Sequence, residues 1–465
     1  MSIQNPSIAV RIPSRPPTPF GVYSGLHTHT YPNGFRVVYE KPFSPVPNTA
    51  IYAFCDLGSI YEHDGIRGGS HFIEHMCFKG THKIKTSKEI YMKYAKVGAY
   101  FNASTEKRCT YYITKTQDEY TEHCINIVSD MMLNSTFPKT EMEKEENVVI
   151  DENLKDSDNP ENEVGIYMDK LLYGSNSYGY PVDTLEYHKK RRFDYDEIMD
   201  LYKTFYKPSR MVLSIVSNLS FKRILQILKH THFTRSHNDC IHRLDKYPII
   251  YKPIVQTEIC YHLQKHTGAN TTIVLFAFRT CPQNSKDRYP LNLLENIIGD
   301  SLNSRLVTIL REDNGLTYSS YAYTSYFEQG GEFQIYALVD KNKVIKNGKM
   351  LGVIPLLINM INDLYTNGVT ADEVKLAKIS IKSNKILHMA QNSTQAIHNG
   401  KELLYTNNII PYSQMYDTYY KNIEKSDVDR VIQTYFVKSG MNLCLLGDNL
   451  PSLNSVKREC EKMRK

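Results

Sequence analysis

The order of predicted elements in the first half of the chain starts again in the second half. Residues 49–59 predict a strand and residues 68–80 a helix, and a polar stretch near 233–255 follows the first half. Residues 269–280 then predict a strand and residues 287–306 a helix without histidine. The sequence therefore predicts a duplicated α+β fold, in which each copy is an antiparallel or mixed sheet flanked by helices.

Chain length supports two domains, because 465 residues exceed what one hydrophobic core usually holds. We expect a catalytic domain over residues 26–235 and a second, metal-free domain over residues 256–465. Residues 236–255 are predicted to be a linker, and residues 1–25 a flexible N-terminal arm, since prolines interrupt any helix there.

Composition excludes several classes of protein. The net charge of +6 is small for this length and no basic run accompanies it, so nucleic acid is not an expected partner. No apolar stretch approaches the roughly 18 residues of a membrane-spanning helix. Nine cysteines without a CxxC pair indicate reduced thiols. A cytoplasmic location is expected, with the mitochondrial matrix as the alternative.

The segment His71-Phe72-Ile73-Glu74-His75 carries two histidines four residues apart. On a helix such positions share one face, so both imidazoles could bind one metal ion. Glu74 would lie beside them as a base. A catalytic zinc takes three protein ligands and leaves a fourth position for water. A surface helix with a Glu–His pair would show the same pattern, so a third ligand has to decide between the two.

A glutamate-rich helix predicted over residues 141–155 offers that ligand. Glu145 and Glu152 are seven residues apart, which is about two turns, so both project from one face. The alternative for such residues is a solvated acidic face, and this is the expectation for Glu141, Glu143 and Glu146.

The spacing resembles the pitrilysin/insulinase family of zinc peptidases, in which HxxEH is followed after 76 residues by a glutamate. Glu152 stands 77 positions after His75, and "HFIEHMCFKGT" is similar to the catalytic subunit of mitochondrial processing peptidase. The resemblance implies that His71, His75 and Glu152 bind one Zn²⁺ per chain and that Glu74 is the general base. It also implies that Glu145 is a second carboxylate that supports a ligand.

Further blocks extend the resemblance over roughly residues 26 to 450. "SRLVTILREDNGLTYSSY" is similar to the block in which an Arg and a Tyr seven apart face the substrate, here Arg311 and Tyr318. Asn102 and Ala103 resemble edge-strand residues that pair with an extended peptide. The family architecture implies a homodimer, or a heterodimer with a related subunit, that closes like a clamshell around the peptide.

The predicted function is therefore a zinc metalloendopeptidase that hydrolyses unfolded peptides or presequence-like segments. The alternative is a family member that serves as a non-catalytic structural or substrate-binding subunit of a processing-peptidase-like complex. Inactive relatives typically lose a histidine or the base, whereas this chain retains His71, Glu74 and His75.

Overall fold

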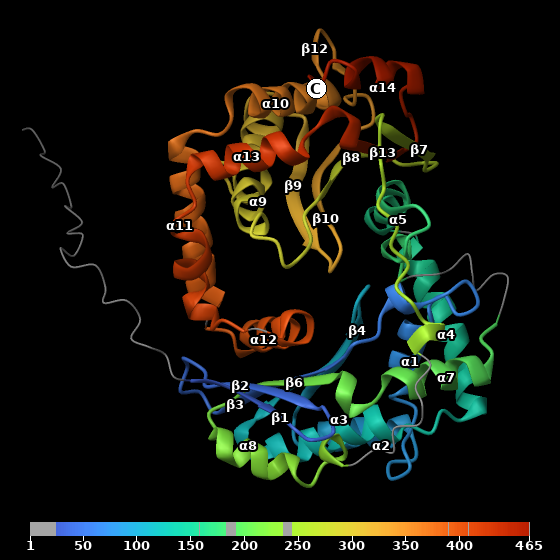
Figure 1. The fold of residues 1–465 in the computed structure, drawn as a ribbon. Helices are drawn as coiled ribbons and strands as arrows, with labels where there is room; N and C mark the ends of the chain where they lie inside the picture. The colour runs from blue at the N-terminus through green and yellow to red at the C-terminus, as the bar shows by residue number, and fades with distance from the viewer. Residues whose placement is uncertain are drawn as a thin grey trace, which may run out of the picture.

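Two mixed β-sheets, one in each half of the chain, form the framework of the computed structural model (Figure 1). The structure describes residues 25–157, 159–182, 192–235, 244–388, 390–407 and 409–464. Most of the predicted arm and part of the predicted linker lie outside these ranges.

The first sheet has six strands in the order β1-β2-β6-β3-β5-β4. β2 and β6 are parallel, and the other neighbours are antiparallel. The strands are β1 (Leu26–Thr30), β2 (Arg36–Glu40), β3 (Asn48–Cys55), β4 (Tyr100–Thr105), β5 (Thr110–Gln117) and β6 (Met211–Val216).

The second sheet repeats five of these strands. Its order is β7-β13-β8-β10-β9, with β7 and β13 parallel and the other neighbours antiparallel, as in β2-β6-β3-β5-β4. This match confirms the predicted duplication and the α+β class. The strands are β7 (Cys260–Lys265), β8 (Thr271–Thr280), β9 (Thr317–Tyr326), β10 (Gly331–Asp340) and β13 (Met441–Gly447), and β11 (Lys346–Asn347) and β12 (Met350–Leu351) form a separate small hairpin.

Helices pack around both sheets. In the first half they are α1 (Gly69–Met76), α2 (Ser87–Ala95), α3 (Thr121–Asn134), α4 (Lys139–Ser157), α5 (Pro160–Tyr173), α7 (Tyr195–Phe205) and α8 (Phe221–Leu228). In the second half they are α9 (Arg288–Glu295), α10 (Val353–Asn367), α11 (Ala371–His388), α12 (Asn392–Thr406), α13 (Lys425–Tyr435) and α14 (Leu453–Cys460).

One predicted helix is interrupted. The expected single helix over residues 287–306 is α9 followed by a wider π-helical turn over Asn296–Asp300. Gly299 in that turn lies against β9, where a Cβ atom would be 2.1 Å from the main-chain nitrogen of Ala322. The close approach requires glycine, and the helical periodicity of the sequence did not reveal it.

The central strands are buried on both faces, which explains their continuous apolar sequences. In β3, Ile51 and Ala53 belong to the larger core of the first half, whereas Tyr52 and Phe54 face a separate cluster that includes Ala396. Both faces of this sheet are therefore covered by helices.

Each half supplies a helix to the other half. α12 packs on β6 and β3 of the first sheet, and α5 packs on β13 and β8 of the second sheet (Figure 1). The two helices also occupy corresponding positions in the duplicated element order. The domain limits at residues 235 and 256 therefore remain a prediction, because the packing units exchange helices across them.

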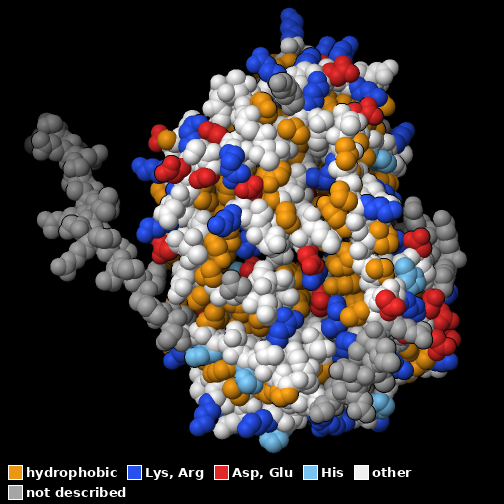
Figure 2. All heavy atoms as spheres, in the orientation of Figure 1, with side chains coloured by type: hydrophobic (Ala, Val, Ile, Leu, Met, Phe, Trp, Pro, Cys, Tyr) orange, Lys and Arg blue, Asp and Glu red, His pale blue; other side chains and the backbone are white. Residues whose placement is uncertain are grey.

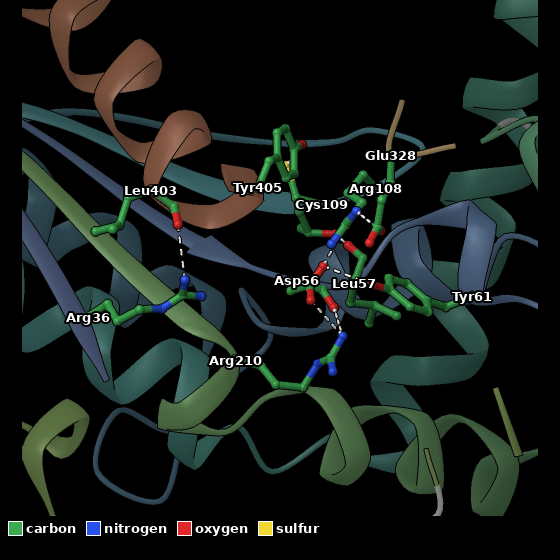
Figure 3. Close-up of polar contacts among 11 residues, drawn as sticks. Arg36, Asp56, Leu57, Tyr61, Arg108, Cys109, Arg210, Glu328, Leu403 and Tyr405 are labelled. Atoms are coloured by element: carbon green, nitrogen blue, oxygen red, sulfur yellow. Dashed lines mark hydrogen bonds and ion pairs between the residues drawn. The ribbon is translucent and has the colours of Figure 1, made fainter. Parts of the chain in front are cut away.

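Buried polar contacts accompany this exchange. On α12, Asn399 donates to the Glu40 carboxylate (2.7 Å) and the Leu403 carbonyl accepts from Arg36 (3.0 Å), as Figure 3 shows for the second contact. Burial raises the pKa of Glu40 to about 6, and the Asn399 hydrogen bond opposes that shift.

Surface charge is dispersed. Lysine, arginine and acidic side chains are interspersed on the face shown in Figure 2, in line with the small net charge. Within the described ranges, no helix is both long and apolar enough to cross a membrane, and the eight cysteines described there are all free.

Two helical glycines provide a test of the exchanged helices. Gly400 on α12 lies so close to the first sheet that a Cβ would be 2.0 Å from the Phe54 ring, whereas a Cβ at Gly165 on α5 would meet nothing within 4 Å. We expect Gly400→Ala to destabilise the protein by about 1–3 kcal/mol through overpacking. Gly165→Ala should stabilise it by up to about 1 kcal/mol through helix propensity. Thermal and denaturant unfolding measure both changes, and equal effects would contradict the packing described.

Candidate metal centre

The short helix α1 is held at its beginning by a buried glutamate. The Glu62 carboxylate accepts hydrogen bonds from the main-chain nitrogens of Gly68 (2.7 Å) and Ser70 (2.8 Å), which α1 itself leaves without partners. Gly68 precedes the helix with φ 81°, a conformation that favours glycine. Burial raises the pKa of Glu62 to about 7, although these hydrogen bonds oppose the shift, and the anionic form suits the helix dipole. The start of α1 is thus fixed.

The two faces of α1 have different surroundings. Phe72, Ile73 and Met76 are fully buried in the core. His71 and His75 lie on another face, with side chains 13% and 19% exposed. The helix therefore presents both imidazoles to a cavity while its apolar face anchors it.

α4 packs against α1 and brings the predicted third ligand to the histidines. Glu152 Oε2 lies 3.3 Å from His75 Nε2 and 3.9 Å from His71 Nε2, and the two imidazole nitrogens are 3.2 Å apart. These three potential ligand atoms all lie within 4.8 Å of one another, close enough for one metal ion to bind them together.

Glu145 supports one of these histidines from behind. Its Oε1 lies 2.8 Å from His75 Nδ1, and its Oε2 forms an ion pair with Lys79. This contact leaves His75 Nε2 facing the cluster, which is the arrangement that second carboxylates impose on metal-binding histidines.

Protonation in the cluster reflects its negative charge. Burial lowers the pKa of His75, but its contacts with Glu145 and Glu152 outweigh burial and raise that pKa to about 9. The hydrogen bond with His75 lowers the pKa of Glu152. Burial raises the pKa of Glu145, but contacts with His75 and Lys79 outweigh it and lower that pKa. Both carboxyl groups are thus held as anions beside a protonated His75, and a metal ion would have to displace that proton in order to bind.

Glu74 is in a different environment. It is 8% exposed, and burial raises its pKa to about 7, although a hydrogen bond from Thr105 opposes the shift. Thr105 Oγ1 donates to Glu74 Oε2 at 2.6 Å. A carboxylate with a pKa near neutrality can take up a proton and release it again at physiological pH.

A cavity of about 730 Å³ contains this cluster and the exposed edge of β4. β4 is the last strand of its sheet, and Asn102 and Ala103 line the cavity. The main-chain nitrogen of Ala103 donates to the side chain of Asn102 (2.9 Å), so it points away from β5. An edge strand with outward main-chain groups can pair with an extended peptide.

Arg311 is not among the described residues that line this cavity, which all lie between His71 and Val182. Arg311 lies in the second half, is exposed, and contacts Glu312 (3.5 Å). Tyr318 is near the start of β9, and its side chain lies outside what the structure describes. Their proposed role therefore remains a prediction.

Sequence reasoning missed several residues of the site. Lys79 forms an ion pair with Glu145, and Thr105 donates to Glu74. Glu62 holds the start of α1. Strand alternation places Thr105 on the same side as Ala103, which was an available signal. Glu146, expected on a solvated face, is buried and accepts from the main-chain nitrogen of Phe193 (2.9 Å).

Comparison with known proteins identifies the family. The model described as "Insulinase (Peptidase family M16)" matches residues 37–182, and "Peptidase M16 inactive domain" matches residues 192–381. An uncharacterized zinc protease of Bacillus subtilis (strain 168) is 30% identical over 379 residues, covering 82% of this chain and 88% of its own. The chain belongs to the insulinase family of peptidases.

Two further known proteins are similar along most of the chain. Subunit beta of the mitochondrial-processing peptidase of Mus musculus is 25% identical over 447 residues, covering 93% of this chain and 86% of its own. A protease from Helicobacter pylori has the same fold, with a TM-score of 0.82, 19% identity, and coverage of 90% of this chain and 99% of its own.

The donor set fits zinc. Two imidazoles and one carboxylate are a donor set found at catalytic zinc sites, where an outer carboxylate such as Glu145 commonly supports a ligand histidine. The zinc proteases among the relatives imply the same metal. Glu74 is not among the three clustered groups, and its carboxylate accepts a hydrogen bond from Thr105.

The Glu145 contact yields a prediction about metal affinity. Glu145→Gln removes the anionic partner of His75, so zinc affinity should fall by about 10- to 100-fold. Glu143→Gln on the exposed side of the same helix should leave the affinity unchanged. Competition with a chromophoric chelator measures both variants. Equal affinities would show that Glu145 does not support the ligand.

Proposed function

We propose that this chain is a zinc metalloendopeptidase that hydrolyses peptide bonds in unfolded peptides or presequence-like segments. One observation carries the proposal: the buried Glu74 carboxylate and three ligand-competent side chains line the same cavity beside an open strand edge. The family and its zinc proteases support the reaction class.

Each residue has a proposed role. His71, His75 and Glu152 would hold a zinc ion, which when bound supplies Lewis-acid activation of water and of the peptide carbonyl. Glu74 would accept the proton of the attacking water and deliver it to the departing amine.

The substrate would bind as an added strand. Ala103 offers its main-chain nitrogen and oxygen at the edge of β4, since both groups of one residue point the same way in an antiparallel pair. Asn102 would exchange its contact with Ala103 for contacts with the peptide. Main-chain recognition of this kind tolerates many side chains.

A second chain completes the proposal. Because Arg311 does not line the cavity, we place Arg311 and Tyr318 opposite the metal centre of a partner, in a homodimer or with a related subunit. There a guanidinium and a phenol would stabilise the oxyanion.

A reducing compartment, cytoplasm or mitochondrial matrix, agrees with the free cysteines.

Replacement of the base tests the reaction. Glu74→Gln should bind zinc as the wild type does but lower kcat on a quenched peptide by about 10²- to 10⁴-fold, because the proton acceptor is lost. Chelation should abolish cleavage and added zinc should restore it. Glu143→Gln serves as the matched control. A wild type that binds zinc stoichiometrically yet cleaves no peptide, alone or with a related subunit, would favour a non-catalytic subunit.

A further inference from the structure

The carboxylate of Glu74 has one hydrogen-bond donor in the described part of the chain. That donor is Thr105 Oγ1, at 2.6 Å from Glu74 Oε2. A glutamate side chain has several rotatable bonds and needs a contact to choose one direction. The Thr105 hydroxyl therefore decides where the carboxylate of the proposed base points.

Thr105 itself is firmly seated. It is the last residue of β4 and pairs with Thr110 across the hairpin, where the two hydroxyl oxygens are 3.3 Å apart. Thr110 Oγ1 donates to the carbonyl of Leu57 (3.0 Å). Gly58 lies so close to the turn that a Cβ would be 2.2 Å from the Glu106 carbonyl oxygen. The hairpin end is thus packed against the Leu57–Gly58 segment.

The three residues after Thr105 each form an ion pair. Glu106 pairs with Lys401 on α12 (2.6 Å) and Lys107 with Asp169 on α5 (2.7 Å). Arg108 pairs with Glu328 of the second half and with Asp56, as Figure 3 shows. All three side chains are partly buried, so solvent screens these ion pairs less than it screens exposed ones. We call residues 106–108 the hairpin tip.

The direction of the Glu74 carboxylate matters because the potential metal ligands lie in the same cavity. Without a donor, the Glu74 carboxylate would be drawn toward the cation that His71, His75 and Glu152 can hold. The carboxylate would then occupy the coordination position that the attacking water needs. A hydroxyl fixed at the strand end holds it back while leaving one oxygen free.

We propose that Thr105 is a positioning residue for the base Glu74, and that the hairpin tip keeps Thr105 in place. The inference rests on the proposed peptidase function. Thr105 acts through Glu74 and has no part in holding the metal. Its loss should therefore affect the catalytic step and leave metal and peptide binding intact.

A pair of variants separates the hydroxyl from the side-chain volume. Thr105→Val keeps the shape and removes the donor, whereas Thr105→Ser keeps the donor. We expect Thr105→Val to lower kcat by about 10- to 100-fold with KM changed by less than about two-fold, because only the orientation of the base is lost. Thr105→Ser should retain most of the wild-type kcat. Zinc stoichiometry and thermal stability should be unchanged in both.

Binding measurements supply the readout beyond activity. In the Glu74→Gln background, which does not turn over the peptide, adding Thr105→Val should leave the affinity for a fluorescent peptide unchanged. A Thr105→Val enzyme with wild-type kcat would overturn the inference. So would a Thr105→Ser enzyme as impaired as Thr105→Val, or loss of zinc or folding in Thr105→Val alone. A wild type without activity would instead overturn the proposed function.

Discussion

The rest of the structure depends on two exchanged helices. α5 packs on the second sheet and α12 packs on the first. Val164 and Met168 of α5 share one core with Leu275 and Ala277 of β8. Apolar burial of this kind is the main favourable contribution to folding. Each sheet would expose an apolar face if the other half were removed. The two halves therefore form one cooperative unit, although the sequence divides into two similar parts.

This exchange also affects the metal centre. Glu152 lies near the end of α4, and α5 begins a few residues later at Pro160. Tyr336 donates to Glu161 (2.8 Å) and Tyr173 donates to Glu332 (2.8 Å), so polar contacts hold both ends of α5 on the second sheet. No described residue of the second half belongs to the cluster of potential ligands, yet that half helps to set the position of Glu152.

Much of the site was predictable because it lies on helices with regular spacing. His71 and His75 are one turn apart, and Glu145 and Glu152 are two turns apart, so periodicity alone placed each pair on one face. Long apolar strands such as β3 and β8 were recognisable for a similar reason. Contacts that depend on three-dimensional proximity were not, such as Lys79 with Glu145, Thr105 with Glu74 and Gly299 with β9. The exchange of α5 and α12 was also invisible, because an amphipathic helix does not specify which sheet it covers.

The free edge of β4 affects how the protein can associate with other molecules. A free strand edge can recruit strands of other molecules and so promote aggregation. Here the main-chain nitrogen of Ala103 already donates to the side chain of Asn102. The edge also lies within a cavity of about 730 Å³. A single extended chain needs less room at such an edge than a folded sheet does. The same geometry thus favours pairing with a flexible peptide over pairing with the strand of a folded protein.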